Sequence, residues 1–380
     1  MSSDPADDTD QTTVITRDMV DAAMSAVVEA SHFLVPVAGQ LPRRPIEVGP
    51  TPVTFGRDRR QLVSVHDPDL SRLHFQVSVV DDRVVLEDMG STNGTFVNDV
   101  RVVATTARVL VQGDEVRAGH QRLRYEHASR QDLAWAARLA NDLSVARGYV
   151  QALLPDPITT GAIHTTWHFE PSAELGGDAF GYRWLDADAF AFYLLDVSGH
   201  GAGSAMHSVA VLNLLRAQDL PDVSLTDPAS VLRYLNARFP MEQHSGLFFT
   251  MWYGVYRTSD RTLRYASAGH HPAFVVDTTR AGATPLEGSG LMIGALDGAP
   301  YTVQETTLPD GASVYLFSDG AFEIDTAAAG MWRLDDLVPH LHAPLTPGVS
   351  EAERLYALVA ATSANATLAD DFSMLVLTFA

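Results

Sequence analysis

Residues 190–201 read Phe-Ala-Phe-Tyr-Leu-Leu-Asp-Val-Ser-Gly-His-Gly, a strand-like run that ends in an aspartate. The first six residues are apolar or aromatic, which is typical of a buried strand. Asp196 then opens a glycine-rich turn, and residues 203–218 follow with a helical pattern. A carboxylate at the end of a strand is rigidly held and can converge with others on one point. The stretch therefore predicts a strand, a turn and a helix, with Asp196 as a candidate functional residue.

Three further places in the sequence put acidic residues at a turn or a strand end. Asp178 ends the run Glu-Leu-Gly-Gly-Asp, Asp319 stands in Ser-Asp-Gly after an expected strand, and Asp370 and Asp371 directly precede the last expected strand. One Asp-Gly pair alone is usually an ordinary turn. Four such places together favour a metal site. Oxygen ligands without cysteine or a histidine cluster favour Mg²⁺ or Mn²⁺ over zinc.

Strand-like and helical runs alternate between residues 160 and 380, which predicts an α+β layered domain. The helix is expected at 203–218, and two of the expected strands read as a hairpin pair. The expected strands are 190–195, 247–257, 262–266, 313–317 and 372–379.

This region resembles the PPM family of metal-dependent Ser/Thr phosphatases, in the bacterial branch typified by the stage II sporulation protein E phosphatase and stress-response regulators. Besides the aspartates, it carries Val-Gln-Ala-Leu-Leu-Pro at 150–155, Leu-Phe-Phe-Thr at 247–250 and Ser-Ala-Gly-His-His-Pro at 267–272. The resemblance implies an α/β/β/α sandwich over residues 157–380, with two facing antiparallel sheets and helices outside. It also implies hydrolysis of phosphoserine or phosphothreonine by metal-activated water, without a covalent phosphoenzyme.

Carried over residue by residue, the resemblance implies that two Mn²⁺ or Mg²⁺ ions bind here. Asp196 would bridge them, and the Val197 carbonyl would help to hold the second ion. Asp319 and Asp370 would complete the first site, whereas Asp178 would act on the second ion largely through water. Asp196 and Asp178 are therefore the expected catalytic residues.

Some positions depart from the family pattern or leave a role open. Many members carry another aspartate three residues after Asp178, where this chain has Gly181. His200 either protonates the leaving oxygen or orders its own loop. His270 and His271 are expected to shape the turn near the site. No arginine is placed by a motif to clamp the substrate phosphate.

Residues 32–126 have a different pattern, with short apolar runs between turn clusters, which predicts an all-β sandwich or barrel. Three pieces stand in order there: Phe-Gly-Arg at 55–57, Ser-Arg-Leu-His at 71–74 and Ser-Thr-Asn-Gly-Thr at 91–95. At these separations they resemble the forkhead-associated (FHA) domain, which we expect over residues 30–127.

An FHA domain binds phosphothreonine peptides with loops at one end of a β-sandwich, and the resemblance implies the same here. Arg57 would form charge-assisted hydrogen bonds to the phosphate, and Asn93 would hold the peptide backbone. His74 is expected to be a buried structural histidine. The expected phosphopeptide-binding residues are Arg57, Ser71, Arg72, Thr92 and Asn93.

Before the expected FHA domain, residues 1–29 form an acidic N-terminal extension, with a short helix predicted at 18–30. After the domain, a helical linker is expected over residues 128–156. Two interpretations of the linker stand, a helix packed on its own domain and a homodimeric coiled coil. Both interpretations rest on apolar residues that recur at alternating intervals of three and four positions, as along the seam of a coiled coil. These residues are Ala136, Leu139, Leu143, Ala146, Val150 and Leu153.

The composition excludes several kinds of chemistry and partner. There is no Cys, which rules out disulfides and cysteine-based phosphatases, and all 26 basic residues are Arg, which rules out P-loop and kinase lysines. The net charge of −21 argues against a nucleic-acid partner, although residues 41–130 hold thirteen Arg against twelve acids and would accept an anion. No apolar run reaches membrane-spanning length and no secretory signal is visible, so we expect a cytoplasmic protein.

Taken together, these patterns predict a phosphatase regulated by its FHA domain, which would bind a phosphothreonine made by an upstream Ser/Thr kinase. By resemblance, its substrate would be an anti-sigma-factor antagonist or a similar regulator. The alternative is a catalytically inactive phosphopeptide-binding scaffold, which the complete set of aspartates disfavours. A weaker alternative is capture of a phosphorylated Thr9, Thr12, Thr13 or Thr16 by the chain's own FHA domain.

Overall fold

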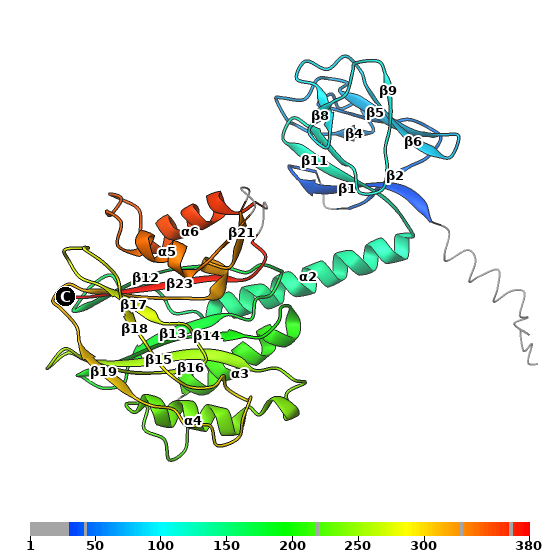
Figure 1. Cartoon of the computed structure of the whole chain (residues 1–380). Coiled ribbons are helices and arrows are strands. Elements are labelled where there is room, and N and C mark those ends of the chain that lie inside the picture. Colours follow the sequence, from blue (N-terminus) through cyan, green and yellow to red (C-terminus); the bar gives the residue numbers. More distant parts are fainter. Residues whose placement is uncertain (1–29, 42–43, 218–219, 327–329, 365–367) are drawn as a thin grey trace, which may run out of the picture. The chain divides into compact units, whose positions relative to one another are not determined.

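The computed structural model describes residues 30–41, 44–217, 220–326, 330–364 and 368–380 (Figure 1). The N-terminal extension, with its four threonines and almost all of the expected short helix, lies outside these ranges. The chain divides into two compact units between Asn141 and Asp142. No helix in the described ranges is both long enough and apolar enough to span a bilayer.

The first unit is a sandwich of two β-sheets, as the alternating apolar runs predict. Its strands are β1 (Ser31–Ala38), β2 (Ile46–Val48), β3 (Val53–Gly56), β4 (Val63–Ser64), β5 (Phe75–Val80), β6 (Arg83–Asp88), β7 (Thr95–Val97), β8 (Val100–Arg101), β9 (Ala107–Val109), β10 (Glu115–Ala118) and β11 (Gln121–Ala128). One sheet has the order β2-β1-β11-β10-β7-β8 and the other β4-β3-β5-β6-β9.

Alternation of side chains along each strand builds the core between these sheets. In β11, Gln121, Leu123 and Tyr125 are buried and the residues between them are exposed. Leu123 packs in one apolar cluster with Phe55 and Phe75 of the other sheet. The all-β prediction for this unit is confirmed.

Helix α2 (Arg130–Leu153) contains the division between the two units. The Ser129 hydroxyl caps it by accepting a hydrogen bond from a first-turn backbone amide at 3.0 Å. Near its C-terminal end, Val150 packs against Leu175 and Ala205 of the second unit. Leu139, in the earlier half of the seam, is 42% exposed. The C-terminal half of the seam therefore packs on its own domain, and the homodimer stays a prediction.

The second unit is built from two five-stranded sheets with helices outside. Its sheets have the orders β12-β23-β20-β17-β18 and β13-β14-β15-β16-β19, and β21 pairs with β22. The elements are β12 (Ile163–Glu170), β13 (Ala179–Trp184), β14 (Ala189–Val197), α3 (Ala202–Ala217), α4 (Pro228–Arg238), η1 (Met241–Gln243), β15 (Phe249–Arg257), β16 (Thr262–Ala268), β17 (Ala273–Val276), β18 (Thr284–Leu286), β19 (Gln304–Thr307), β20 (Ser313–Phe317), η2 (Asp319–Ala321), β21 (Ile324–Thr326), β22 (Gly330–Trp332), α5 (Leu334–Leu341), α6 (Glu351–Thr362) and β23 (Phe372–Phe379).

These elements form four layers. Figure 1 shows α5 and α6 on one outer face, next to β12 and β23, and α4 on the opposite face, next to β15 and β16. The two sheets pack together through aromatic side chains such as Phe192 of β14 and Phe379 of β23, whose ring centroids lie 5.9 Å apart. Strand β14 is buried along almost its whole length because one face meets the other sheet and the opposite face meets helices. The expected α/β/β/α sandwich is confirmed.

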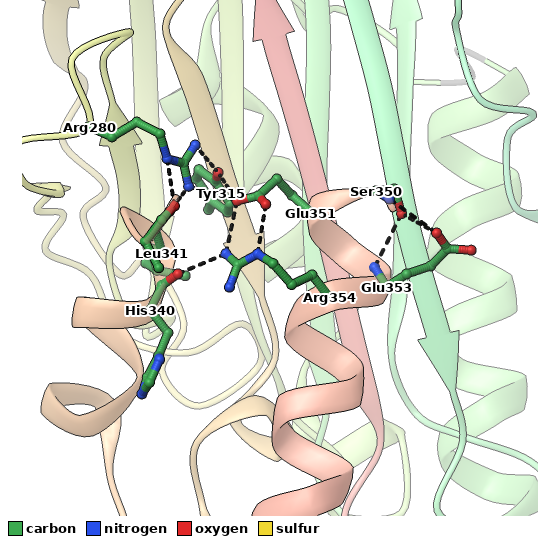
Figure 2. A network of polar contacts seen from close by, with 9 residues as sticks. Arg280, Tyr315, His340, Leu341, Ser350, Glu351, Glu353 and Arg354 are labelled. Atoms are coloured by element: carbon green, nitrogen blue, oxygen red, sulfur yellow. Dashed lines mark hydrogen bonds and ion pairs between the residues drawn. The ribbon is translucent and has the colours of Figure 1, made fainter. Parts of the chain in front are cut away.

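A partly buried ion-pair network ties α5 and α6 to the sheet beneath them (Figure 2). Both Arg280 and Arg354 donate to the Glu351 carboxylate, at 2.8 Å and 2.7 Å, and the Tyr315 hydroxyl donates to it at 2.8 Å. The two arginines also donate to backbone carbonyls near the end of α5. Burial acts to raise the pKa of Glu351, but these hydrogen bonds outweigh it, so that the pKa lies below its usual value.

Candidate functional sites

The acidic residues that the sequence singles out come from separate segments of the second unit. Antiparallel pairing of Ala179 with Leu195 brings Asp178, just before β13, beside Asp196 in β14. In the other sheet, β20 pairs with β23. That pairing brings Asp319, just after β20, to the same end as Asp370, just before β23. The sheet topology therefore gathers residues that are far apart in sequence.

These carboxylates lie close together and repel one another. Burial, and then the charges of Asp319, Asp370 and Asp371, raise the pKa of Asp196 to about 7. Burial and the charge of Asp370 raise the pKa of Asp319 to about 6. No arginine forms an ion pair with any of these aspartates among the described residues. Such a cluster is costly as it stands and would be stabilised by bound cations.

Asp178 gives the most direct indication that a metal ion fits here. Its side chain is 2% exposed, and its Oδ2 atom has no hydrogen-bond partner in the described chain. Burial and the charge of Asp196 hold its pKa well above the usual range. A Cβ atom on Gly177 would lie 2.7 Å from the Val197 carbonyl oxygen, so only glycine lets that carbonyl approach the Asp178 loop. The donors are all oxygens, as Mg²⁺ and Mn²⁺ prefer.

The neighbouring residues Asp370 and Asp371 have different environments. Asp370 is exposed, whereas Asp371 is 3% exposed. The Asp371 carboxylate accepts hydrogen bonds from the Ser172 amide at 2.8 Å and from the Gly177 amide at 2.6 Å. Asp371 therefore braces the loop that carries Asp178. The sequence pointed to both acids, but only the structure separates their surroundings.

The loop after Asp196 is held by backbone contacts and leaves His200 at the surface. The Ser204 hydroxyl donates to the Ser198 carbonyl at 3.1 Å, and the Gly201 amide donates to the Leu175 carbonyl at 3.2 Å. His200 is exposed and lies near enough to Asp370 to favour its charged form. Both roles considered for His200 stay open.

His270 and His271 are fixed between the two sheets. The Thr250 hydroxyl lies 2.8 Å from His270 Nδ1, and His270 Nε2 donates to the Phe317 carbonyl at 3.1 Å. The His271 ring stacks on Phe317 with ring centroids 4.7 Å apart, and its buried Nε2 has no partner within the described chain. Both contacts reach the residue at the end of β20, two positions before Asp319. The pair therefore supports the strand end that carries this aspartate.

We expect His271 to make the second unit acid-labile. Burial lowers the pKa of His271 to about 4. The pKa of a histidine in an unfolded chain is about 6.5. The stabilisation is therefore complete above about pH 6.5 and is lost as the pH falls toward 4, because only the unfolded chain takes up this proton. In His271→Phe, the drop in unfolding free energy between pH 7.5 and 5 should shrink by about 2 kcal/mol, measured by urea denaturation. The exposed His164→Phe control should keep the wild-type slope, and an unchanged slope in His271→Phe would contradict the assignment.

In the first unit, all five residues expected to bind a phosphopeptide line one pocket of about 800 Å³. Within the described residues, neither Arg57 nor Arg72 has an ion-pair partner. Arg60, at the same pocket, is by contrast paired with Asp58 at 2.7 Å. Two guanidinium groups in one pocket therefore keep N–H groups that are not engaged in ion pairs.

Hydrogen bonds between loops set the shape of this pocket. The Ser71 hydroxyl accepts from the Thr92 amide at 3.0 Å, and the Asn93 side-chain amide donates to the Asp69 carbonyl at 3.0 Å. His74, which is fully buried, accepts from the Ser71 amide through Nδ1 and lies 3.1 Å from the Gly94 carbonyl through Nε2. His74 is therefore a structural link between two loops, as expected.

One group in the first unit has the spacing of a metal site but is already used. Asp67, Asp69 and His120 have potential ligand atoms within 4.8 Å of one another. In the described ranges, no other group of three or more His, Asp or Glu residues meets this distance. The Asp67 carboxylate accepts from the His120 amide at 2.9 Å and from the Gln121 side chain at 2.8 Å. This carboxylate therefore ties two loops together, and we assign no metal to it.

Two family models match the chain, one within each of its two units. The model of the SpoIIE family, described as stage II sporulation protein E, matches residues 186–380. The FHA domain model matches residues 53–119.

Individual relatives are similar to more than half of this chain. "Phosphoserine phosphatase RsbP" of Bacillus subtilis is 24% identical over 208 residues, covering 54% of this chain and 50% of that protein. "Phosphoserine phosphatase RsbU" of the same species is 26% identical over 227 residues, covering 58% of this chain and 64% of that protein. The chain thus spans less than two thirds of either relative. The solved SiaA-PP2C domain of Pseudomonas aeruginosa superposes with a TM-score of 0.58 at 23% identity, covering 65% of this chain and 99% of that domain, which supports the fold.

Proposed function

Because this chain belongs to the SpoIIE family and also carries an FHA domain, we propose that it is a metal-dependent phosphatase for phosphoserine or phosphothreonine in a regulatory protein. The observation that carries the proposal is the aspartate cluster, in which Asp178 is buried without a partner for Oδ2 among the described residues. Strong desolvation and mutual repulsion in a cluster are typical of functional sites.

The residues that would hold two Mn²⁺ or Mg²⁺ ions are Asp178, Asp196, the Val197 carbonyl, Asp319 and Asp370. When bound, such ions supply an activated water and neutralise charge on the transferring phosphoryl group. The chain's own contribution is rigid placement of the carboxylates at strand ends, with Asp371 holding the Asp178 loop through the Gly177 amide. Asp196 and Asp178 are the residues proposed to act in catalysis.

The proposal is tested by phosphate release from a phosphoserine peptide with Mn²⁺, with Mg²⁺ and with a chelator. We expect turnover only when a divalent ion is present. If folded protein releases no phosphate with excess metal, even after a phosphothreonine peptide is added, the scaffold alternative is favoured instead.

The substrate class follows from the relatives. RsbP and RsbU are both named as phosphoserine phosphatases. We extend this activity to an anti-sigma-factor antagonist or a similar small regulator in the cytoplasm as the substrate of this chain. A panel of phosphorylated regulators from the source organism, assayed for dephosphorylation rate, would identify it.

The pocket of the first unit is proposed to bind a phosphothreonine made by an upstream Ser/Thr kinase. We expect Arg57→Ala to weaken binding of a phosphothreonine peptide about 100-fold, because charge-assisted hydrogen bonds contribute about 1.5–3 kcal/mol each. Arg60→Ala is the matched control, since its guanidinium is already paired with Asp58, and should change affinity less than about threefold. Fluorescence polarisation measures both. Equal binding of phosphorylated and unphosphorylated peptide would exclude this role.

We further propose that α2 links the two activities, through its packing on the second unit or through a homodimer along its exposed seam. Val150 of α2 contacts Leu175, which lies three residues before Asp178. A change at α2 therefore has a short route to the aspartate cluster. If a bound phosphothreonine peptide alters neither turnover, metal affinity nor oligomeric state, this coupling is wrong.

A further inference from the structure

A second pocket in the phosphatase unit, of about 290 Å³, lies away from the aspartate cluster. It is bounded by the end of α2, by β13 and by α3, with Leu153, Gly181, Arg183, Tyr193, Leu212 and Arg216 among its walls. Arg183 follows Asp178 by five residues along β13, roughly 16 Å at the rise of an extended strand. The pocket and the aspartate cluster are therefore separate places on the same sheet.

The Tyr193 hydroxyl is the first polar group of this pocket. The side chain is 4% exposed, and its hydroxyl forms no hydrogen bond with any group in the described chain. The Tyr193 ring is held by stacking on Tyr253, with centroids 5.9 Å apart. Burial raises the pKa of Tyr193, so the phenol stays protonated and can donate a hydrogen bond.

Gly181 makes room for this hydroxyl. It pairs directly with Tyr193 across β13 and β14, which puts the two on the same face of the sheet. A Cβ atom at position 181 would lie 2.4 Å from the Tyr193 hydroxyl oxygen. The residue that departs from the family's usual aspartate therefore permits a buried phenol to face the pocket.

Two arginines complete the polar side of the pocket. Arg183 donates to the Arg216 carbonyl at 2.8 Å, and Arg216 donates to the Leu153 carbonyl at 2.5 Å. The Arg183 Nε atom is buried without a partner, and within the described residues neither guanidinium forms an ion pair. Their backbone contacts hold both side chains in place and leave other N–H groups of each guanidinium to donate.

No acidic side chain lines the pocket, and its polar side consists of hydrogen-bond donors. Its remaining walls include Leu153 and Leu212, which are apolar. We propose that this pocket binds a small organic anion, with a carboxylate or phosphate group between Arg183, Arg216 and the Tyr193 hydroxyl, and an apolar body against the leucines. Its volume is near the lower limit for small-molecule sites, about 300 Å³. A ligand here would contact α2, β13 and α3 together.

The test uses the full chain, without divalent metal and with a chelator, so that a phosphonate has no ion to bind at the aspartates. The probes are 4-fluorobenzoate and 4-fluorophenylphosphonate, followed by ¹⁹F NMR titration, and they separate carboxylate from phosphate recognition. We expect at least one probe to bind with a dissociation constant below about 1 mM, the range of weak specific ligands. Arg183→Gln combined with Arg216→Gln should weaken it at least tenfold.

Two further variants make the test decisive. Tyr193→Phe keeps the stacked ring and removes only the hydroxyl, so the fold should persist while affinity falls by about threefold to tenfold. Arg238→Gln removes an exposed, unpaired arginine of α4 and should leave affinity unchanged. If neither probe binds the wild-type chain, or if all variants bind as the wild type does, the proposed site is wrong.

Discussion

In Asp196→Asn, phosphate release with Mn²⁺ should fall by about three orders of magnitude or more, because catalytic metal ions supply several kcal/mol of charge stabilisation. Asp196 lies between carboxylates from both sheets, and their charges together with burial raise its pKa to about 7. The substitution removes a proposed bridging charge while keeping nearly the same shape. The rise in melting temperature caused by Mn²⁺ should therefore shrink as well, since ligand binding stabilises the folded state by RT ln(1 + [L]/Kd) and weaker binding stabilises it less.

Without metal, Asp196→Asn should affect stability in the opposite direction from its effect on activity. Removing one of several repelling charges should make the Asp196→Asn protein at least as stable as the wild type in a chelator. Asp222→Asn is the matched control, an exposed turn residue with a φ of 62° that asparagine accepts. Its activity should equal that of the wild type. Retention of a tenth or more of wild-type activity in Asp196→Asn would show that the aspartate cluster is not the catalytic centre.

Glu351→Gln should lower the unfolding free energy of the second unit by about 3 kcal/mol, because it leaves two arginines without their counter-charge. The side chains of Arg280, Arg354 and Glu351 are only 11–17% exposed, so solvent screens them weakly. For a unit of this size, the melting temperature should fall by about 6–12 °C. Differential scanning calorimetry with and without Mn²⁺ measures the change.

Glu353, on the same helix and also drawn in Figure 2, provides the control. It accepts from the Ser350 amide at 3.2 Å in an exposed capping box, a role that glutamine also fills. Glu353→Gln should therefore cost less than about 1 kcal/mol. Similar losses for the two variants would mean that the ion-pair network contributes little to stability.

Most of the fold could be predicted where apolar runs are long. The runs at 313–317 and 372–379 coincide with β20 and β23 because a buried strand needs an uninterrupted apolar face. Strands β4 and β8 have two residues each and were not predicted, since so short a segment carries no periodic signal. Their positions depend on pairing with distant strands.

The candidate sites, too, could be predicted only in part from the sequence. Motifs with fixed spacing identified the aspartates and the loop residues of the FHA pocket. The pocket of Tyr193, Arg183 and Arg216 could not be found from spacing, because its groups come from β14, β13 and α3 and meet only after the sheet forms. Gly181 offered the only sequence signal, as a departure from the family pattern.

The adjacency of Asp370 and Asp371 links the two sheets at the aspartate cluster. Asp371 holds the Gly177 amide, and the next residue in the chain is Asp178, whereas Asp370 is covalently joined to Asp371. A movement that withdraws Asp370 must therefore also pull on the loop that positions Asp178. One hydrogen bond and one peptide bond thus join aspartates from the two sheets, so that a displacement at the start of β23 would be transmitted to the Asp178 loop as well.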